Sequence, residues 1–87
     1  MKYDIPLTVA AYIYDCQVKG ERVWFRKLVE NLPYDRNEVS QALDDLFDLY
    51  IIYGYYGEIP GNKATRLYKL WNCVIPIIEP IWRELYA

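Results

Sequence analysis

The stretch DRNEVSQALDDLFD, residues 35–48, begins with side chains that can form specific hydrogen bonds. The amides of Asn37 and Gln41 can each make two parallel bonds to the edge of an adenine base, and the Ser40 hydroxyl adapts to several partners. With Arg36, these residues lie on the outer side of a helix if the stretch is helical. Such a set could recognise nucleic-acid bases, or it could be the solvated side of an ordinary amphipathic helix.

The second half of the same stretch carries three carboxylates, on Asp44, Asp45 and Asp48. A calcium ion needs six or more oxygen ligands, usually from a looped backbone, which a regular helix does not supply. Phosphates would be repelled by these groups. The carboxylates therefore predict a solvated acidic face, or a surface that meets a basic protein partner.

Catalytic chemistry is not indicated elsewhere in the chain. There is no histidine, and Cys16 and Cys73 are far apart in no metal-binding or redox spacing. Glycine-rich phosphate loops and serine- or cysteine-centred motifs are also missing. We therefore expect no enzyme activity and no metal or cofactor. Both thiols are expected to be reduced and buried, with a disulfide between them as the alternative.

Composition points to a small globular chain with an unusual charge balance. The 87 residues carry ten Lys and Arg against twelve Asp and Glu, a formal net charge of −2, and 54% are hydrophobic. Nucleic-acid binders usually carry a basic surplus, so a nucleic-acid partner requires the cations to gather on one face. The most apolar stretch, CVIPIIEPIW, is short and interrupted, which predicts that it does not span a bilayer. No positively charged segment leads into an apolar run near residue 1, so we expect a cytoplasmic protein.

Helical spacing of apolar residues predicts the elements that position these side chains. Residues 5–17 are expected to form a helix with Asp4 as its cap and Pro6 in its first turn. This helix is apolar nearly all round, so it must be covered on two sides. An extended piece at residues 22–24 and a second helix at residues 25–32 are expected to follow.

The third predicted helix contains the polar stretch described first. Asp35 and Glu38 have the spacing of a capping box, which fixes the start of the helix. Its predicted inner face consists of Val39, Leu43, Leu46, Phe47 and Tyr50.

A β-hairpin is expected from Leu49 to Trp71, because this segment is rich in β-branched and aromatic residues. Its tip is placed near Pro60, Gly61 and Asn62.

The final element, from residue 72 to the end, reads as a helix with a strongly apolar stripe. Pro76 fits in its first turn, whereas Pro80 should kink the helix or delay its start. The stripe consists of Val74, Ile78, Ile81, Trp82 and Leu85.

This order of elements resembles the winged helix-turn-helix domain of small dimeric transcriptional regulators. The resemblance covers about residues 5–71. It rests on VWFRKLVENL as second helix, LPYD as turn, RNEVSQALDDLFDL as third helix and YIIYGYYGEIPGNKATRLYKL as wing. It implies an α+β, mainly helical fold, with a winged-helix domain in residues 1–71 and an extra C-terminal helix in residues 72–87.

The resemblance implies sequence-specific binding of double-stranded DNA, with the third helix in the major groove and the wing on the backbone. Because Asp44, Asp45 and Asp48 would meet phosphates if the helix lay flat, only its first two turns are expected to enter. The implied DNA-binding residues are Arg26, Lys27, Arg36, Asn37, Ser40, Gln41, Lys63 and Arg66.

The resemblance also implies a homodimer, which would present two reading heads to successive major grooves about 34 Å apart. The alternative is that the C-terminal helix covers the first helix of its own chain. The expected dimer interface is formed by Leu7, Ala11, Tyr14, Ile75, Ile78, Ile81, Trp82 and Leu85.

A second function from a different class stays open. The chain could be a winged-helix module that docks on a basic protein through its acidic helix face and does not bind DNA. Gathering of the cations on one surface would favour DNA, and their scatter would favour the protein partner.

Overall fold

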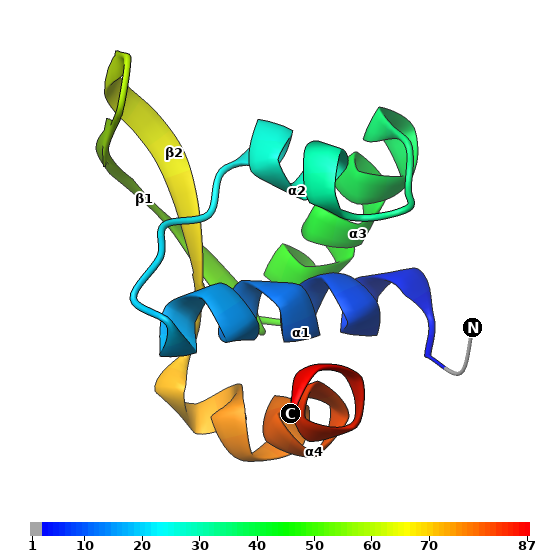
Figure 1. Cartoon of the computed structure of the whole chain (residues 1–87). Helices are drawn as coiled ribbons and strands as arrows, with labels where there is room; N and C mark the ends of the chain where they lie inside the picture. Colours follow the sequence, from blue (N-terminus) through cyan, green and yellow to red (C-terminus); the bar gives the residue numbers. More distant parts are fainter. Residues whose placement is uncertain (1–2) are drawn as a thin grey trace.

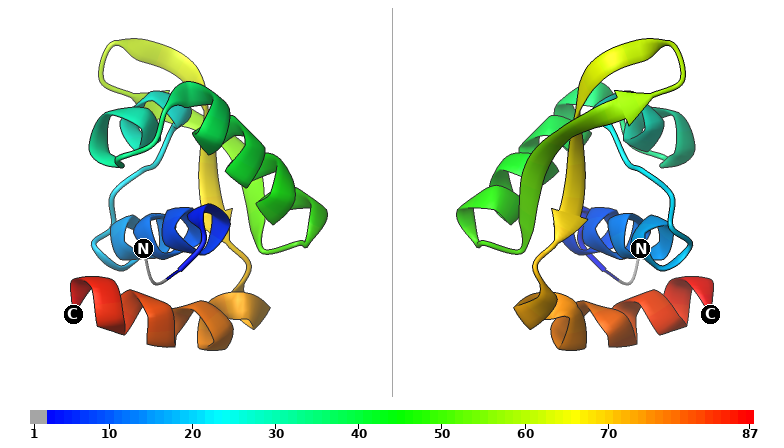
Figure 2. Two further views of the ribbon diagram at one scale, coloured as in Figure 1. Left: turned by 90° about the vertical axis from the view of Figure 1, so that its right-hand side faces the viewer. Right: turned by 90° about the vertical axis from the view of Figure 1, so that its left-hand side faces the viewer.

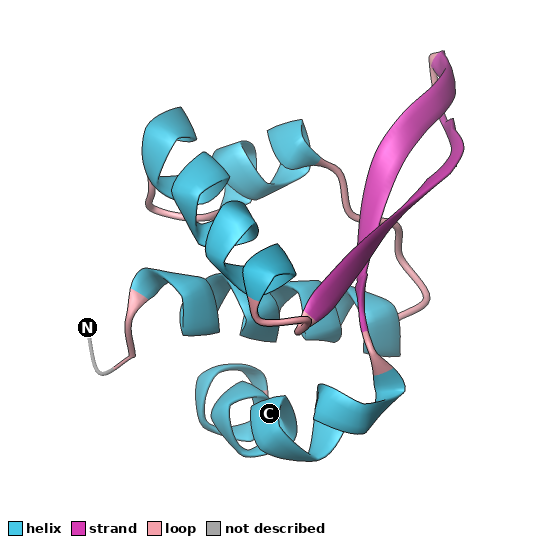
Figure 3. Ribbon diagram, turned by 180° about the vertical axis from the view of Figure 1, so that it is seen from behind, coloured by secondary structure: helices cyan, strands magenta, loops and turns pink. Residues whose placement is uncertain are grey.

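The computed structural model describes residues 3–87, except for the side chains of residues 62 and 63. Helix α1 (Ile5–Val18) lies in the middle of the molecule, with α3 on one side and α4 on the other (Figures 1 and 2). Strands β1 and β2 form a hairpin that projects beyond the helices (Figure 3). The fold is the predicted one, α+β and mainly helical, in a winged-helix arrangement.

Helix α1 begins and is covered as the sequence predicts. The Asp4 carboxylate accepts a 3.1 Å hydrogen bond from the backbone N–H of Leu7, and Pro6 lies in the first turn. Val9, Ala10 and Ile13 are fully buried. Because α1 is apolar nearly all round, it is covered by α3 on one side and by α4 on the other. Burial of both sides removes apolar surface from water and stabilises the packing of the chain.

Helices α2 (Phe25–Asn31) and α3 (Arg36–Asp48) form the helix-turn-helix pair. The predicted capping box is present. The N–H of Glu38 donates to Asp35 Oδ1 at 2.8 Å, and the N–H of Asp35 donates to Glu38 Oε1 at 3.1 Å. Leu28 of α2 and Val39 of α3 are fully buried in the core.

The predicted place of Tyr50 on the inner face of the third helix is wrong. Tyr50 is 77% exposed and has a left-handed backbone with φ 56°. The N–H groups of Tyr50 and Ile51 donate to the carbonyls of Phe47 and Leu46. This is the Schellman arrangement that ends a helix, usually with glycine at the left-handed position. It turns the chain before the first strand, which begins at Ile52 and not at Leu49.

The wing is an antiparallel pair of strands, β1 (Ile52–Ile59) and β2 (Asn62–Leu70). They pair from Ile52 opposite Leu70 to Ile59 opposite Asn62, so the tip lies at residues 60 and 61 as predicted. The extended piece before α2 joins the hairpin through a 3.1 Å bond from the N–H of Tyr68 to the carbonyl of Val23.

A 3₁₀ turn (Asn72–Val74) leads into α4 (Ile75–Tyr86). Pro76 lies in the first turn as predicted, but Pro80 does not delay the helix, which continues through it. Because Pro80 has no N–H, the carbonyl of Pro76, four residues earlier, has no helical partner. Both prolines are exposed, which gives this carbonyl access to water. Ile78 is fully buried in the common core, so residues 72–87 pack with the winged-helix part.

Within residues 3–87, no helix has both the length and the apolar character needed to cross a bilayer.

Candidate nucleic-acid interface

Three arginines that are far apart in sequence line one hollow between α2, α3 and the wing. Arg26 comes from the first turn of α2, Arg36 from the first residue of α3, and Arg66 from β2. The hollow has a volume of about 380 Å³ and is also lined by Trp24, Phe25, Ile59, Thr65 and Tyr68. Among the residues that the structure describes, no Asp or Glu lines it. An anion is therefore the ligand that its charge favours.

Aromatic rings hold two of these guanidinium groups in place. Arg36 Cζ lies 5.1 Å from the centre of the Phe25 ring, and Arg66 Cζ lies 4.8 Å from the centre of the Phe47 ring. Such cation–π contacts restrict the side chain without neutralising it. Arg26 pairs with Glu30 of its own helix at 3.3 Å, but both side chains are well exposed. Exposed pairs of this kind contribute little and exchange readily with another anion.

Gly54 makes room for Arg66. A Cβ atom at position 54 would lie 2.8 Å from Arg66 Nε, closer than real contacts allow. This role could not be predicted from the sequence, because Gly54 lies in β1 and Arg66 in β2, where Arg66 pairs with Tyr56 and not with the glycine.

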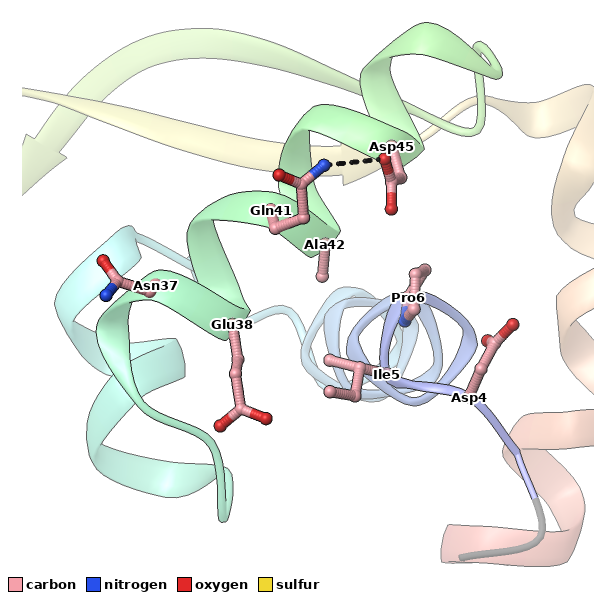
Figure 4. A pocket seen from close by; sticks show the side chains of 8 residues that line it. All are labelled: Asp4, Ile5, Pro6, Asn37, Glu38, Gln41, Ala42 and Asp45. Carbon is pink, nitrogen blue, oxygen red and sulfur yellow. Dashed lines mark hydrogen bonds between the residues drawn. The ribbon is translucent and has the colours of Figure 1, made fainter.

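The predicted base-reading residues lie along the exposed side of α3. Arg36, Asn37, Ser40 and Gln41 are all exposed. The Gln41 amide donates a 3.1 Å hydrogen bond to Asp45 Oδ1, which directs it along α3 toward Asp45 (Figure 4). Helical spacing places Arg36 and Ser40 on the wing side of α3, and Gln41 on the α1 side.

One predicted phosphate contact, Lys27, does not line this hollow. The ammonium of Lys27 donates to Glu21 Oε1 at 3.1 Å and to the carbonyl of Arg22 at 3.0 Å, and its side chain is only 17% exposed. Lys27 therefore fastens α2 to the preceding loop, and its contact with phosphate stays a prediction. The predicted contact by Lys63 concerns a side chain outside the described residues.

The second half of α3 is acidic. Asp44 and Asp48 are exposed, and Asp45 is half-buried beside the first turn of α1. Asp45 and Asp48 line hollows that contain no described Lys or Arg, whereas Arg36 at the start of α3 lines the hollow that contains no described carboxylate. This separation could not be read from the net charge.

The predicted dimer interface contains residues that the chain itself covers. Ala11 and Ile78 are fully buried, so their predicted contact with a second subunit is wrong. The indole of Trp82 packs edge-on against Tyr14, with ring centres 5.3 Å apart. The Tyr14 hydroxyl donates to Glu79 Oε2 at 3.3 Å. These contacts place α4 on α1, which is the intramolecular alternative of the sequence analysis.

Part of α4 nevertheless offers apolar surface. Ile77 is 67% exposed and Leu85 43% exposed, with the partly exposed Ile81 between them. Their four-residue spacing aligns them on one flank of the helix. Ile77 was missing from the predicted set, although the same spacing would have found it.

Both cysteines are free thiols. Cys16 is buried as predicted, whereas Cys73 is exposed at the start of the C-terminal segment, which corrects the prediction for that residue.

No protein-family model matches the chain, and no curated protein matches it in sequence. Among solved structures, the chain is similar to the crystal structure of Pex from Synechococcus sp. strain PCC 7942. The TM-score is 0.60 at 19% sequence identity, and the match covers 98% of this chain and 84% of that one. The likeness extends over α4 as well as the wing, and at this identity it concerns the fold alone.

Proposed function

We propose that this chain is a sequence-specific binder of double-stranded DNA that acts as a homodimeric transcriptional regulator. The observation that carries the proposal is the hollow lined by Arg26, Arg36 and Arg66 with no described carboxylate in its lining. In a chain of net charge −2, this gathering of cations is a local feature and not a reflection of composition.

In the proposed complex, a phosphate group occupies the hollow and fixes the position of α3 against the duplex. Asn37 and Ser40 then face base edges in the major groove. The exposed carboxylates of Asp44 and Asp48 keep the second half of α3 out of the groove, so the helix enters steeply.

For the homodimer, the proposal uses the exposed flank of α4 formed by Ile77, Ile81 and Leu85. The buried inner face of α4 is unavailable, since it covers α1. Pairing of two such flanks would remove apolar surface from water and set two α3 helices on one face of the DNA.

The test is fluorescence anisotropy of a labelled duplex from the upstream region of the gene, against a scrambled duplex of equal composition, at two salt concentrations. We expect tighter binding to the upstream duplex and a log–log salt slope of roughly 0.9 per phosphate contact. A triple variant with Arg26, Arg36 and Arg66 changed to Ala should lose binding to both duplexes.

The matched control is Arg83→Ala, which removes a cation paired with Glu79 on α4. It should bind as the wild type does. Absence of binding at low salt, or an equal loss in the control, contradicts the proposal.

A further inference from the structure

A second surface lies on the other flank of α3, where the start of α1 faces it across a groove (Figure 4). Two adjoining hollows, with volumes of about 570 and 450 Å³, share Asp4, Pro6 and Asp45 in their linings. Together they run from the first turn of α3 to the segment between α3 and β1.

The floor and rim of this groove differ in chemistry. The apolar residues of the lining are Ile5, Pro6, Leu7, Ala42, Leu46, Leu49 and Ile51. Carboxylates come from Asp4, Glu38, Asp45 and Asp48. Among the described residues, no Lys or Arg lines either hollow.

The end of the groove near β1 exposes large apolar side chains. Leu49 is 66% exposed, and its neighbour Tyr50 is 77% exposed. Both follow directly on α3, so apolar surface continues outward from the groove floor. Apolar surface rimmed by charge is typical of a surface that binds another molecule.

We propose that this groove binds a basic segment of a partner protein, with one or two apolar side chains on the floor and Lys or Arg opposite the carboxylates. Charge complementarity carries the choice of occupant. Four carboxylates repel nucleic acid and any acidic peptide, whereas a purely cationic ligand would leave the apolar floor in water.

The position of the groove gives the interaction a consequence for DNA. Asn37 and Gln41 line the groove, and Asn37 also faces base edges in the proposed function. A seated peptide would cover both amides, so it competes with specific DNA binding. This consequence rests on the proposed function, whereas peptide binding itself does not.

The experiment is selection of displayed random peptides on the immobilised full chain, with counter-selection on an Asp45→Lys, Asp48→Lys variant. The matched control is Glu30→Lys, Glu58→Lys, which makes the same change in charge on α2 and the wing. We expect enriched peptides that combine Lys or Arg with Leu, Ile or Phe. Their affinity should fall roughly tenfold or more in the groove variant and stay unchanged in the control.

Several results would overturn the proposal. They are no enrichment, an enriched pool without positive charge, or equal losses in both variants. Self-association of the chain that the groove variant alone abolishes would assign the groove to a second copy instead. If the double variant does not fold, Asp48→Lys alone repeats the comparison at an exposed position. Competition with the DNA duplex is measured afterwards, so loss of DNA binding and loss of peptide binding are read separately.

Discussion

The indole N–H of Trp82 in α4 donates a 3.0 Å hydrogen bond to Oδ1 of Asp15 in α1. The other carboxylate oxygen pairs with Lys19 at 2.9 Å, and the Asp15 side chain is 9% exposed. Burial alone would raise the pKa of Asp15, but the bonds from Trp82 and Lys19 outweigh it and hold the pKa below its ordinary value. A charged group of α1 thus joins the two helices, in addition to the bond from the Tyr14 hydroxyl to Glu79.

Trp82→Phe should destabilise the chain. The change keeps an aromatic ring beside Tyr14 but removes the N–H that bonds to a buried carboxylate, and such bonds contribute about 2 kcal/mol. Urea denaturation followed by circular dichroism measures the free energy of unfolding. Trp71→Phe is the control, because Trp71 is 44% exposed, and it should change the free energy much less. Equal effects would mean that the Asp15 bond contributes nothing.

The stability of the chain should depend on acid in a defined direction. Because the pKa of Asp15 is lower in the folded state, its contribution is fully present above about pH 4, the ordinary aspartate value. It is lost as the pH falls through the lowered pKa. As the pH is lowered from about 6 to about 2, the free energy of unfolding should fall less steeply in Asp15→Asn than in the wild type. Parallel curves would contradict this.

Tyr50→Gly should raise stability. The left-handed backbone of Tyr50 is strained for a residue with a Cβ atom, and its exposed ring loses little packing when removed. Relief of this strain should raise the free energy of unfolding by about 1 kcal/mol. The greater freedom of glycine in the unfolded chain should offset part of that gain. Tyr50→Ala removes the ring but keeps the strain, so it should bring no gain. A thermal melt of the three proteins makes the comparison.

Gly54→Ala should weaken DNA binding without removing a charge. The added methyl group would meet Arg66 Nε at 2.8 Å and displace the guanidinium from the Phe47 ring. Arg66→Ala should lower the salt slope by roughly 0.9 if the arginine contacts one phosphate, whereas Gly54→Ala should lower affinity by less. Anisotropy titrations give both values. Wild-type affinity in Gly54→Ala would show that the placement of Arg66 is unimportant.

The two thiols should react at very different rates. Cys73 is exposed and should react at once with a chromogenic disulfide reagent. Burial of Cys16 raises the pKa of its thiol, and a buried neutral thiol is a poor nucleophile, so it should react only in denaturant. Cys73→Ala should leave a single slow thiol. Two fast thiols in the native protein would mean that α1 opens readily.

Local signals predicted most of the fold. The capping box of Asp35 and Glu38 and the cap at Asp4 depend on neighbours within one helical turn, and both are present. The end of α3 was predicted at the wrong residue because Tyr50 has a left-handed backbone, which at the end of a helix is usually found at glycine. Apolar spacing alone could not reveal this.

The candidate site was predicted only in part, because its geometry depends on contacts between distant segments. Arg26, Arg36 and Arg66 were named from the resemblance, and the structure brings all three to one hollow. Lys27 was named by the same reasoning, yet Glu21 binds its ammonium. Whether Lys27 is free or paired depends on the path of the loop that carries Glu21, and the sequence does not specify that path.

The two rings that carry the arginines of the hollow also pack against the hydrophobic core. Phe25 and Phe47 each touch that core on one side and a guanidinium on the other. Under the proposed function, selection for a stable interior and selection for affinity would act on the same two side chains. A lineage that exchanged Phe47 for an aliphatic residue could keep its fold, yet it would release Arg66 and change the proposed binding through a position that does not line the hollow.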